Sequence, residues 1–199
     1  MSVPDELVGA WRRRSISLGG GAPRETRHVL WLQACDAYAD VRIPLGDRDT
    51  GSWRAFAGPV TWHAPRLHWH HEIDSCVRPA PDHAVLSWDG AILVERGVAA
   101  VGGRRVPYEE RWARVDRGHV TLVARSDDGR SWLVRVGRYA LALTDGRAAG
   151  GAFCARLGVL VGGRWRELWR ARSGVRGPGP ATPVLAGPWR VVEASVPAR

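Results

Sequence analysis

The sequence predicts an all-β protein in which consecutive antiparallel strands follow one another as a meander and close into a single barrel. Short β-rich runs recur along all 199 residues, and no window carries an apolar stripe with the 3.6-residue period of a helix. Turn residues separate these runs, and the clearest is Asp89-Gly90, a dipeptide typical of tight hairpins. We expect about 10–12 strands from this spacing. Closing a sheet of that size avoids long open edges, so a barrel is favoured over a sandwich.

In the N-terminal half, glycine and proline turns mark where the strands end. A short helical turn at Pro4–Val8 precedes the first strand, Gly19–Gly21 ends that strand, and Ala64–Arg66 turns a later hairpin. Between these turns we expect strands at Trp11–Leu18, His28–Ala34, Tyr38–Pro44, Trp53–His63 and Leu67–Asp74.

In the rest of the chain, Asp-Gly dipeptides and Asp116–Gly118 provide the turns. The expected strands are Ala84–Trp88, Ala91–Arg96, Val106–Val115, His119–Arg125, Ser131–Leu143, Ala155–Val161, Trp165–Ala171 and Pro188–Ala194. Arg164–Arg172 also fits a short helix, because its apolar residues share one helical face, and this alternative stays open. Residues 173–188 are rich in glycine and proline, which predicts a loop before the last strand.

Length and composition are those of one globular unit, and we expect a single domain over residues 1–199. The hydrophobic fraction is 45%, and no apolar run is long enough to cross a membrane. The eleven tryptophans are spread along the chain, and side chains of this size suit the wall of a barrel. Three distant cysteines and an N-terminus without a secretory pattern predict reduced thiols and a cytoplasmic protein.

The net charge of +9 arises entirely from arginine. All 29 basic residues are Arg, and the chain contains no Lys or Asn, a bias typical of a GC-rich coding sequence. The excess over 20 acidic residues still favours attraction to an anionic ligand or partner. Basic balance alone does not indicate dedicated nucleic-acid binding, and we do not predict it.

Several segments resemble known barrel proteins. Leu7–Arg12 contains a Gly-x-Trp sequence similar to the opening of calycins, the superfamily of lipocalins and fatty-acid-binding proteins. Further segments resemble a little-characterised calycin-like family of bacteria and fungi that includes the yeast Hri protein: Val29–Gln33, Tyr38–Pro44, Phe56–Gly58, Trp69–Asp74 and Tyr108–Trp112. The resemblance implies a barrel with a pocket, with the tryptophan packed across its closed end. It implies no particular activity.

Strand Tyr38–Pro44 carries a polar face and an apolar face, and two orientations compete. Side chains alternate along a strand, so Tyr38, Asp40 and Arg42 share one side, opposite the apolar residues. If the apolar side fills the barrel, Asp40 and Arg42 form a surface pair of small energetic value. If the polar side faces inward, Arg42 is a fork for a ligand carboxylate and Tyr38 adds a hydroxyl group.

The richest polar run is His68–Cys76. One side of this strand carries His71 among apolar neighbours, and we expect its pKa to be lowered there, so that it is neutral and available as a base or a haem ligand. A hydrogen-bonded core histidine is the interpretation that this pattern favours over a catalytic one. The other side carries His68, His70 and Glu72, a set able to reach one metal ion. A solvated outer face explains the same pattern, and we predict no metal site.

Two further polar residues are candidates for the interior. Tyr108, Glu110 and Trp112 share one side of their strand, which makes Glu110 an inward carboxylate with Arg42 as its expected partner. Arg135 lies on a later strand and is a comparable candidate. No nucleophile elbow, phosphate loop or dinucleotide fingerprint is present, and no cofactor is predicted.

Three hypotheses about function follow from these residues. The first is a barrel that binds a small, largely apolar molecule with an acidic or polar group. In that case Trp31 and Trp69 line the cavity, and Tyr38, Arg42, His71 and Arg135 contact the ligand.

The second hypothesis is a cofactor-independent isomerase, cyclase or lyase with His71 or Glu110 as its base. The third is a protein-interaction module with a basic surface. The sequence separates neither binder from enzyme nor monomer from oligomer.

Overall fold

The computed structural model describes residues 2–45, 53–76, 82–173 and 189–195. Within these ranges the chain is almost entirely β-structure, and its one helical element is a single 3-10 turn at Arg147–Ala149. The predicted all-β class is therefore confirmed. The described residues contain no helix with the length and apolar character needed to cross a membrane.

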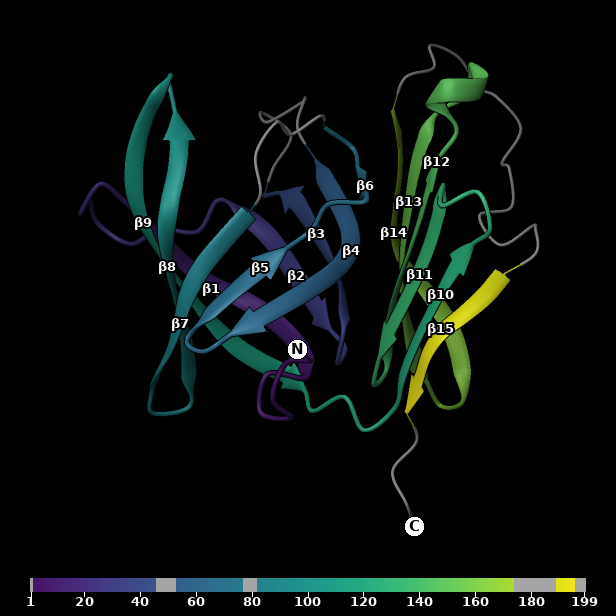
Figure 1. Ribbon diagram of the computed structural model, residues 1–199, viewed down its shortest axis with the longest axis horizontal. Helices are drawn as coiled ribbons and strands as arrows, with labels where there is room; N and C mark the ends of the chain where they lie inside the picture. Colours follow the sequence, from purple (N-terminus) through teal and green to yellow (C-terminus); the bar gives the residue numbers. More distant parts are fainter. Residues whose placement is uncertain (1, 46–52, 77–81, 174–188, 196–199) are drawn as a thin grey trace.

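The N-terminal strands form a closed antiparallel barrel (Figure 1). They are β1 (Gly9–Leu18), β2 (Arg27–Gln33), β3 (Ala37–Pro44), β4 (Arg54–His63), β5 (Arg66–Trp69), β6 (Ile73–Asp74), β7 (Asp82–Asp89), β8 (Ile92–Val101) and β9 (Arg104–Asp116). Eight of them follow the order β3-β2-β1-β9-β8-β7-β5-β4, and pairing of β3 with β4 closes the ring. The short strand β6 continues the pairing of β5 along β4.

The remaining strands form a second sheet beside the barrel (Figure 1). They are β10 (Thr121–Ser126), β11 (Ser131–Val136), β12 (Tyr139–Asp145), β13 (Phe153–Val161), β14 (Arg164–Ser173) and β15 (Trp189–Ser195). Their order is β14-β13-β12-β11-β10-β15. The barrel thus has eight strands rather than the ten to twelve expected, because the β3–β4 pairing leaves no free edge for later strands to join.

Three predicted elements differ in detail. The expected strand Ser131–Leu143 is a hairpin that turns at Gly137, which has a φ of 57°. The expected strand Leu67–Asp74 is interrupted after Trp69 and resumes at Ile73. The segment Arg164–Arg172 is a strand, so its helical alternative is wrong. Of the predicted loop 173–188, Ser173 ends β14 and the other residues lie outside the described ranges.

Two apolar clusters pack on opposite sides of the barrel wall. One lies between the barrel and the second sheet, where Ala39 and Val41 of β3 pack with residues such as Val134 and Leu141. The other fills the barrel and includes Trp31, Tyr38, Phe56, Trp69 and Trp112. Because β3 alternates, covering its apolar side with the second sheet turns its polar side into the barrel.

The N-terminal segment packs at the lower end of the barrel in Figure 1. The Nε1–H group of Trp11 donates a hydrogen bond to the carbonyl of Leu7 at 2.9 Å. Trp11 is fully buried, and its ring lies 6.1 Å from that of Trp31 and 4.5 Å from the guanidinium of Arg114. Together with Val3 and Leu7, it closes this end with apolar side chains.

A candidate ligand site inside the barrel

A small cavity, partly open to solvent, lies inside the barrel. Its wall combines aromatic rings with a few charged groups. The aromatic residues are Trp31, Tyr38, Phe56, Trp69 and Trp112, and the charged residues are Asp40, Arg42, Asp82 and Glu95. They come from seven strands, so the site depends on closure of the whole barrel.

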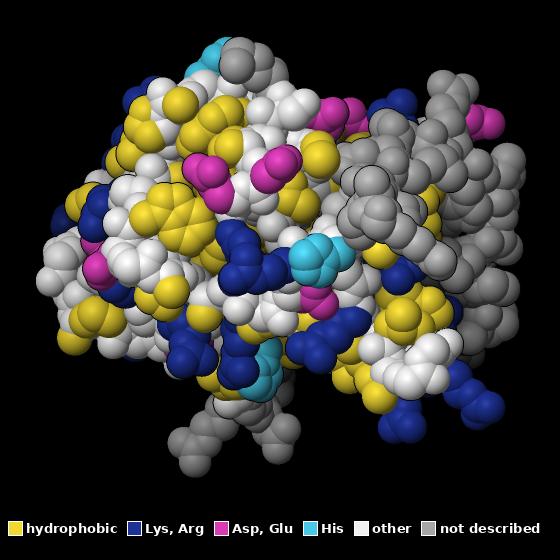
Figure 2. Space-filling model, turned by 90° about the horizontal axis from the view of Figure 1, so that it is seen from below, with side chains coloured by type: hydrophobic (Ala, Val, Ile, Leu, Met, Phe, Trp, Pro, Cys, Tyr) yellow, Lys and Arg dark blue, Asp and Glu magenta, His cyan; other side chains and the backbone are white. Residues whose placement is uncertain are grey.

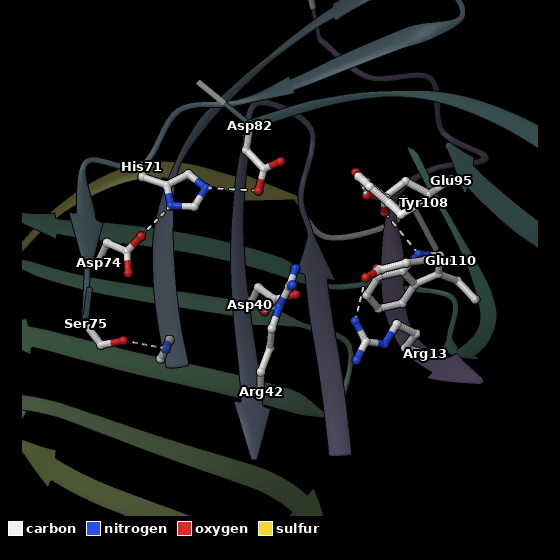
Figure 3. A network of polar contacts seen from close by, with 12 residues as sticks. Arg13, Asp40, Arg42, His71, Asp74, Ser75, Asp82, Glu95, Tyr108 and Glu110 are labelled. Atoms are coloured by element: carbon white, nitrogen blue, oxygen red, sulfur yellow. Dashed lines mark hydrogen bonds and ion pairs between the residues drawn. The ribbon is translucent and has the colours of Figure 1, made fainter. Parts of the chain in front are cut away.

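Strand β3 contributes Tyr38, Asp40 and Arg42 to the cavity wall, and Figure 3 shows Asp40 and Arg42. Arg42 donates a hydrogen bond from Nε to Asp40 Oδ1 at 2.9 Å, and its guanidinium lies 5.2 Å from the centre of the Phe56 ring. Burial alone lowers the pKa of Arg42, but the carboxylates of Asp40 and Glu110 outweigh it and raise the pKa well above the usual value. Arg42 therefore stays charged and is already paired with a carboxylate.

Strands β8 and β9 place two carboxyl groups opposite each other. Glu95 and Glu110 are direct cross-strand partners, and both are buried. Glu95 accepts hydrogen bonds from the Tyr108 hydroxyl at 2.7 Å and from Trp112 Nε1 at 3.0 Å. Burial raises the pKa of Glu95 well above its ordinary value, and the neighbouring charge of Glu110 raises it further. This pair holds a proton more readily than isolated carboxyl groups do.

Arg13 on β1 contacts Glu110 of this pair, as Figure 3 shows, and also Glu25, which precedes β2. Its Nη1 donates to Glu110 Oε1 at 2.5 Å, while Nε and Nη2 form a fork on Glu25 at 2.8 and 3.0 Å. Burial raises the pKa of Glu110 more than Arg42 and Arg13 lower it. Arg42 was the predicted partner of Glu110. Instead, Arg13 makes the hydrogen bond to Glu110, and Arg42 acts on the pKa of Glu110 only through its charge.

His71 lies beside the cavity between two carboxylates. Its Nδ1 is 2.8 Å from Asp74 Oδ2, its Nε2 is 3.6 Å from Asp82 Oδ2, and its ring stacks on Phe56 at 4.3 Å between ring centres. Burial alone lowers the pKa of His71, but the hydrogen bonds and charges of Asp74 and Asp82 raise it overall. The predicted lowering was wrong, because the sequence gives no sign that two acids flank the ring.

Most of the predicted site residues come together. Trp31, Tyr38, Arg42 and Trp69 line the cavity. His71 stacks on the wall residue Phe56, and Glu110 is the cross-strand neighbour of the wall residue Glu95.

Arg135 lies elsewhere. It is on β11 of the second sheet, where its Nε donates to the carbonyl of Gly137 at 3.0 Å and its guanidinium lies 5.4 Å from the Trp165 ring. Its strand never enters the barrel, so its prediction as a ligand contact is wrong.

The residues of the alternative metal set have separate partners. His68 stacks on His83 at 5.2 Å, His70 Nε2 lies 2.9 Å from the Thr61 hydroxyl, and Glu72 accepts from Arg125 at 2.9 Å. In the described part of the chain, no three His, Cys, Asp or Glu residues are grouped so as to hold a metal ion.

Sequence reasoning missed Arg13, Asp82 and Glu95. For Glu95 a signal was present, because strand alternation puts it on the same side as the fully buried Leu93. Arg13 sits in a run of three arginines, but alternation puts it on the side of the fully buried Trp11 and leaves Arg12 and Arg14 on the exposed side, so a signal was present here too. Asp82 follows Pro79 and Pro81 in the sequence, and no pattern there indicates that its side chain faces the barrel interior.

Comparison with known proteins supports the fold. The family model described as Protein HRI1 matches residues 10–186. A crystal structure of an uncharacterised protein, YLR301w from Saccharomyces cerevisiae, is similar with a TM-score of 0.71 and 14% sequence identity. The similarity covers 94% of this chain and 98% of the yeast chain. Among curated proteins, none matches.

Proposed function

We propose that the barrel of this chain, which belongs to the Protein HRI1 family, binds a small, largely apolar molecule carrying a polar group. The observation that supports this proposal is the cavity itself. Five aromatic side chains form most of its wall, and four charged side chains are placed among them. Apolar walls with a few fixed polar groups are the general form of small-molecule sites.

We also propose that the chain is a calycin-like protein. An eight-stranded antiparallel barrel and a Gly-x-Trp opening support this assignment. So does the position of Trp11, which packs with the N-terminal turn across one end of the barrel.

The ligand is compact. The enclosed space at this site is small, because the empty volume of about 270 Å³ there includes open solvent. Trp31 and Trp112 are almost completely buried, so the wall has little freedom to expand without repacking. We therefore propose a ligand with few heavy atoms rather than a long fatty acid.

The enzymatic alternative uses the same cavity and stays a prediction. Two features support binding instead. Glu110 is held by Arg13 at 2.5 Å, and the pKa of His71 is raised by Asp74 and Asp82 against the lowering effect of burial. Both candidate bases are therefore already paired with groups of the protein, Glu110 with Arg13 and His71 with Asp74 and Asp82.

Native mass spectrometry of freshly purified protein tests the proposal. We expect extra mass that is lost on denaturation, or, for a protein purified empty, quenching of tryptophan fluorescence by members of a library of compact molecules. Trp69→Phe should weaken the quenching, because Trp69 lines the cavity. The control Trp165→Phe should not, because Trp165 lies on β14 of the second sheet and is 49% exposed. A library without any binder would contradict the proposal.

A further inference from the structure

We propose that the outer edge of β14 is a docking site for an acidic polypeptide segment, which adds to the second sheet as a further strand. The site lies on the second sheet, away from the barrel cavity. It therefore goes beyond the binding of a small molecule and does not depend on it.

Strand β14 is the terminal strand of the second sheet. Among the described residues it pairs with β13 alone, while every other strand from β13 to β10 has a partner on both sides. The outward N–H and C=O groups of such an edge strand are available to another chain. With ten residues, Arg164–Ser173, β14 is long enough to pair with an added strand of ordinary length.

The positive charge of the chain is concentrated on the same sheet. Residues 120–173 contain ten arginines and four acidic residues, a net charge of +6, whereas residues 1–119 contain 16 arginines and 15 acidic residues. Figure 2 shows arginine side chains beside apolar ones on the right, the side on which the second sheet lies in Figure 1. A surface of this charge attracts acidic partners.

Strand β14 carries more arginines than the fold can pair. Its four arginines are all exposed: Arg164, Arg166, Arg170 and Arg172. Its one acid, Glu167, lies 2.7 Å from Arg156 and 3.4 Å from Arg170. No ion pair joins the other three arginines of β14 to any described residue. A partner with carboxylates would supply the missing counter-charges.

These arginines lie on both faces of the edge. Arg166 is paired with Val159 and shares its side of the sheet, whereas Arg170 is paired with Arg156 on the opposite side. The extra residue that changes the side is Leu168, because Glu167 pairs with Gly158 and the next pair is Leu157 with Trp169. The alternating side chains of an added strand would therefore meet guanidinium groups on either face.

Exposed apolar side chains lie beside the arginines. Val161, Trp165 and Leu168 are 48%, 49% and 55% exposed. The Trp165 ring lies over Gly158, where a Cβ atom would be 3.5 Å from it, and 5.4 Å from the guanidinium of Arg135. Apolar side chains of a bound segment would gain contacts here. The partner that fits best is thus an extended segment that combines acidic and apolar residues.

The same features disfavour two other occupants. A second copy of β14 would bring arginines against arginines, and charged edge strands are a known means of preventing such pairing. Single-stranded nucleic acid needs several exposed rings on which bases stack. In β14 only Trp165 offers one, because the ring of Trp169 packs against Trp53 at 5.5 Å.

Three labelled probes of equal negative charge test the proposal by fluorescence anisotropy. They are an eight-residue peptide of alternating glutamate and valine, the same peptide with all backbone nitrogens methylated, and an oligothymidylate with four phosphates. The first peptide should bind at least tenfold more tightly than the other two, since only it combines carboxylates with free backbone donors. Hydrogen exchange should show new protection of the β14 amides in its presence.

A matched pair of double variants locates the site. Arg164→Gln combined with Arg166→Gln should weaken binding of the unmethylated peptide at least tenfold. The control combines Arg104→Gln with Arg105→Gln, which removes two exposed charges from the β8–β9 hairpin on the other side of the molecule (Figure 1). It should change the affinity less than twofold. Thermal unfolding verifies that both variants are folded.

Four outcomes would overturn the proposal. The peptide does not bind, its methylated copy binds as tightly, the oligothymidylate binds more tightly, or the control variant loses as much affinity as the β14 variant. In each case the proposed binding of a small molecule in the barrel stands, because its site shares no residue with β14.

Discussion

At His71, the structure reverses the expected direction of the pKa shift. An isolated histidine in an apolar core loses its proton, yet this ring is flanked by Asp74 at 2.8 Å and Asp82 at 3.6 Å. Its Phe56 stacking partner belongs to the cavity wall. The charge state of His71 is therefore linked to the geometry of the site and to the stability of the fold.

The stability contributed by His71 should depend on pH. Burial lowers its pKa, but Asp74 and Asp82 raise it above the unfolded value of about 6.5. A raised pKa gives stability that is complete below pH 6.5 and is lost as the pH rises through the folded pKa. Asp74→Asn should thus reduce the free energy of unfolding by about 1 kcal/mol more at pH 5.5 than at pH 8.5. Urea unfolding at both pH values measures this.

The control for this prediction is Asp128→Asn. Asp128 is an exposed turn residue that has no contact with His71. In Asp128→Asn, the difference between the free energies of unfolding at pH 5.5 and pH 8.5 should stay close to that of the unmodified protein. A loss of stability in Asp74→Asn that is equal at both pH values would contradict a protonated His71.

At the scale of elements, the β8–β9 hairpin determines the chemistry of the cavity. Its register places Glu95 opposite Glu110 and Gly97 opposite Tyr108. Gly97 gives the Tyr108 ring a place to lie, because a Cβ atom there would be 2.7 Å from the hydroxyl oxygen. The ring position in turn lets the hydroxyl reach Glu95 at 2.7 Å. The absence of a side chain at Gly97 in β8 thus lets the Tyr108 hydroxyl in β9 donate to Glu95.

Gly97→Ala should displace Tyr108 and break its hydrogen bond with Glu95. We expect a loss of about 1–3 kcal/mol in the free energy of unfolding from the steric conflict. Ligand binding should weaken as well, because Glu95 loses a fixed donor. Gly158→Ala is the control within a strand of the second sheet, where a Cβ atom would meet its nearest neighbours at an ordinary 3.5 Å. Equal losses in both variants would argue against the role of Gly97.

At the scale of the molecule, the barrel and the second sheet share one apolar cluster. Ala39 and Val41 from the barrel pack with Val134 and Leu141 from the second sheet, and all four are buried. Each of these two apolar faces would be exposed to water if the other did not cover it. We therefore propose that residues 1–199 form one domain that unfolds as a unit.

Leu141→Ala tests this cooperativity. Removing a fully buried leucine should cost about 2–5 kcal/mol. The loss should appear equally in far-ultraviolet circular dichroism and in tryptophan fluorescence, since the barrel holds most of the buried tryptophans. Leu168→Ala should change stability by less than about 0.5 kcal/mol, because Leu168 is 55% exposed. Two separate transitions in the unmodified protein would refute the single domain.

Local sequence was sufficient to predict the class of fold and most hairpins. The Asp89-Gly90 turn joins β7 and β8 as expected, and the strand predicted at Tyr38–Pro44 is β3 with one added residue. Alternation also identified Tyr38 and Arg42 as a shared face, and Glu110 as an inward carboxylate. These features depend on neighbours in the chain, so a single sequence contains them.

The tertiary structure alone decided which side of β3 faces the cavity, and which strands close the barrel. Alternation distinguishes two faces without saying which is inside, because the choice depends on what covers each face. Here the second sheet covers Ala39 and Val41, which turns Asp40 and Arg42 toward Glu95 and Asp82. Arg135 belongs to the second sheet and therefore lies away from the cavity. Charges distant in sequence become neighbours only when the barrel closes, and their pKa values follow from that proximity.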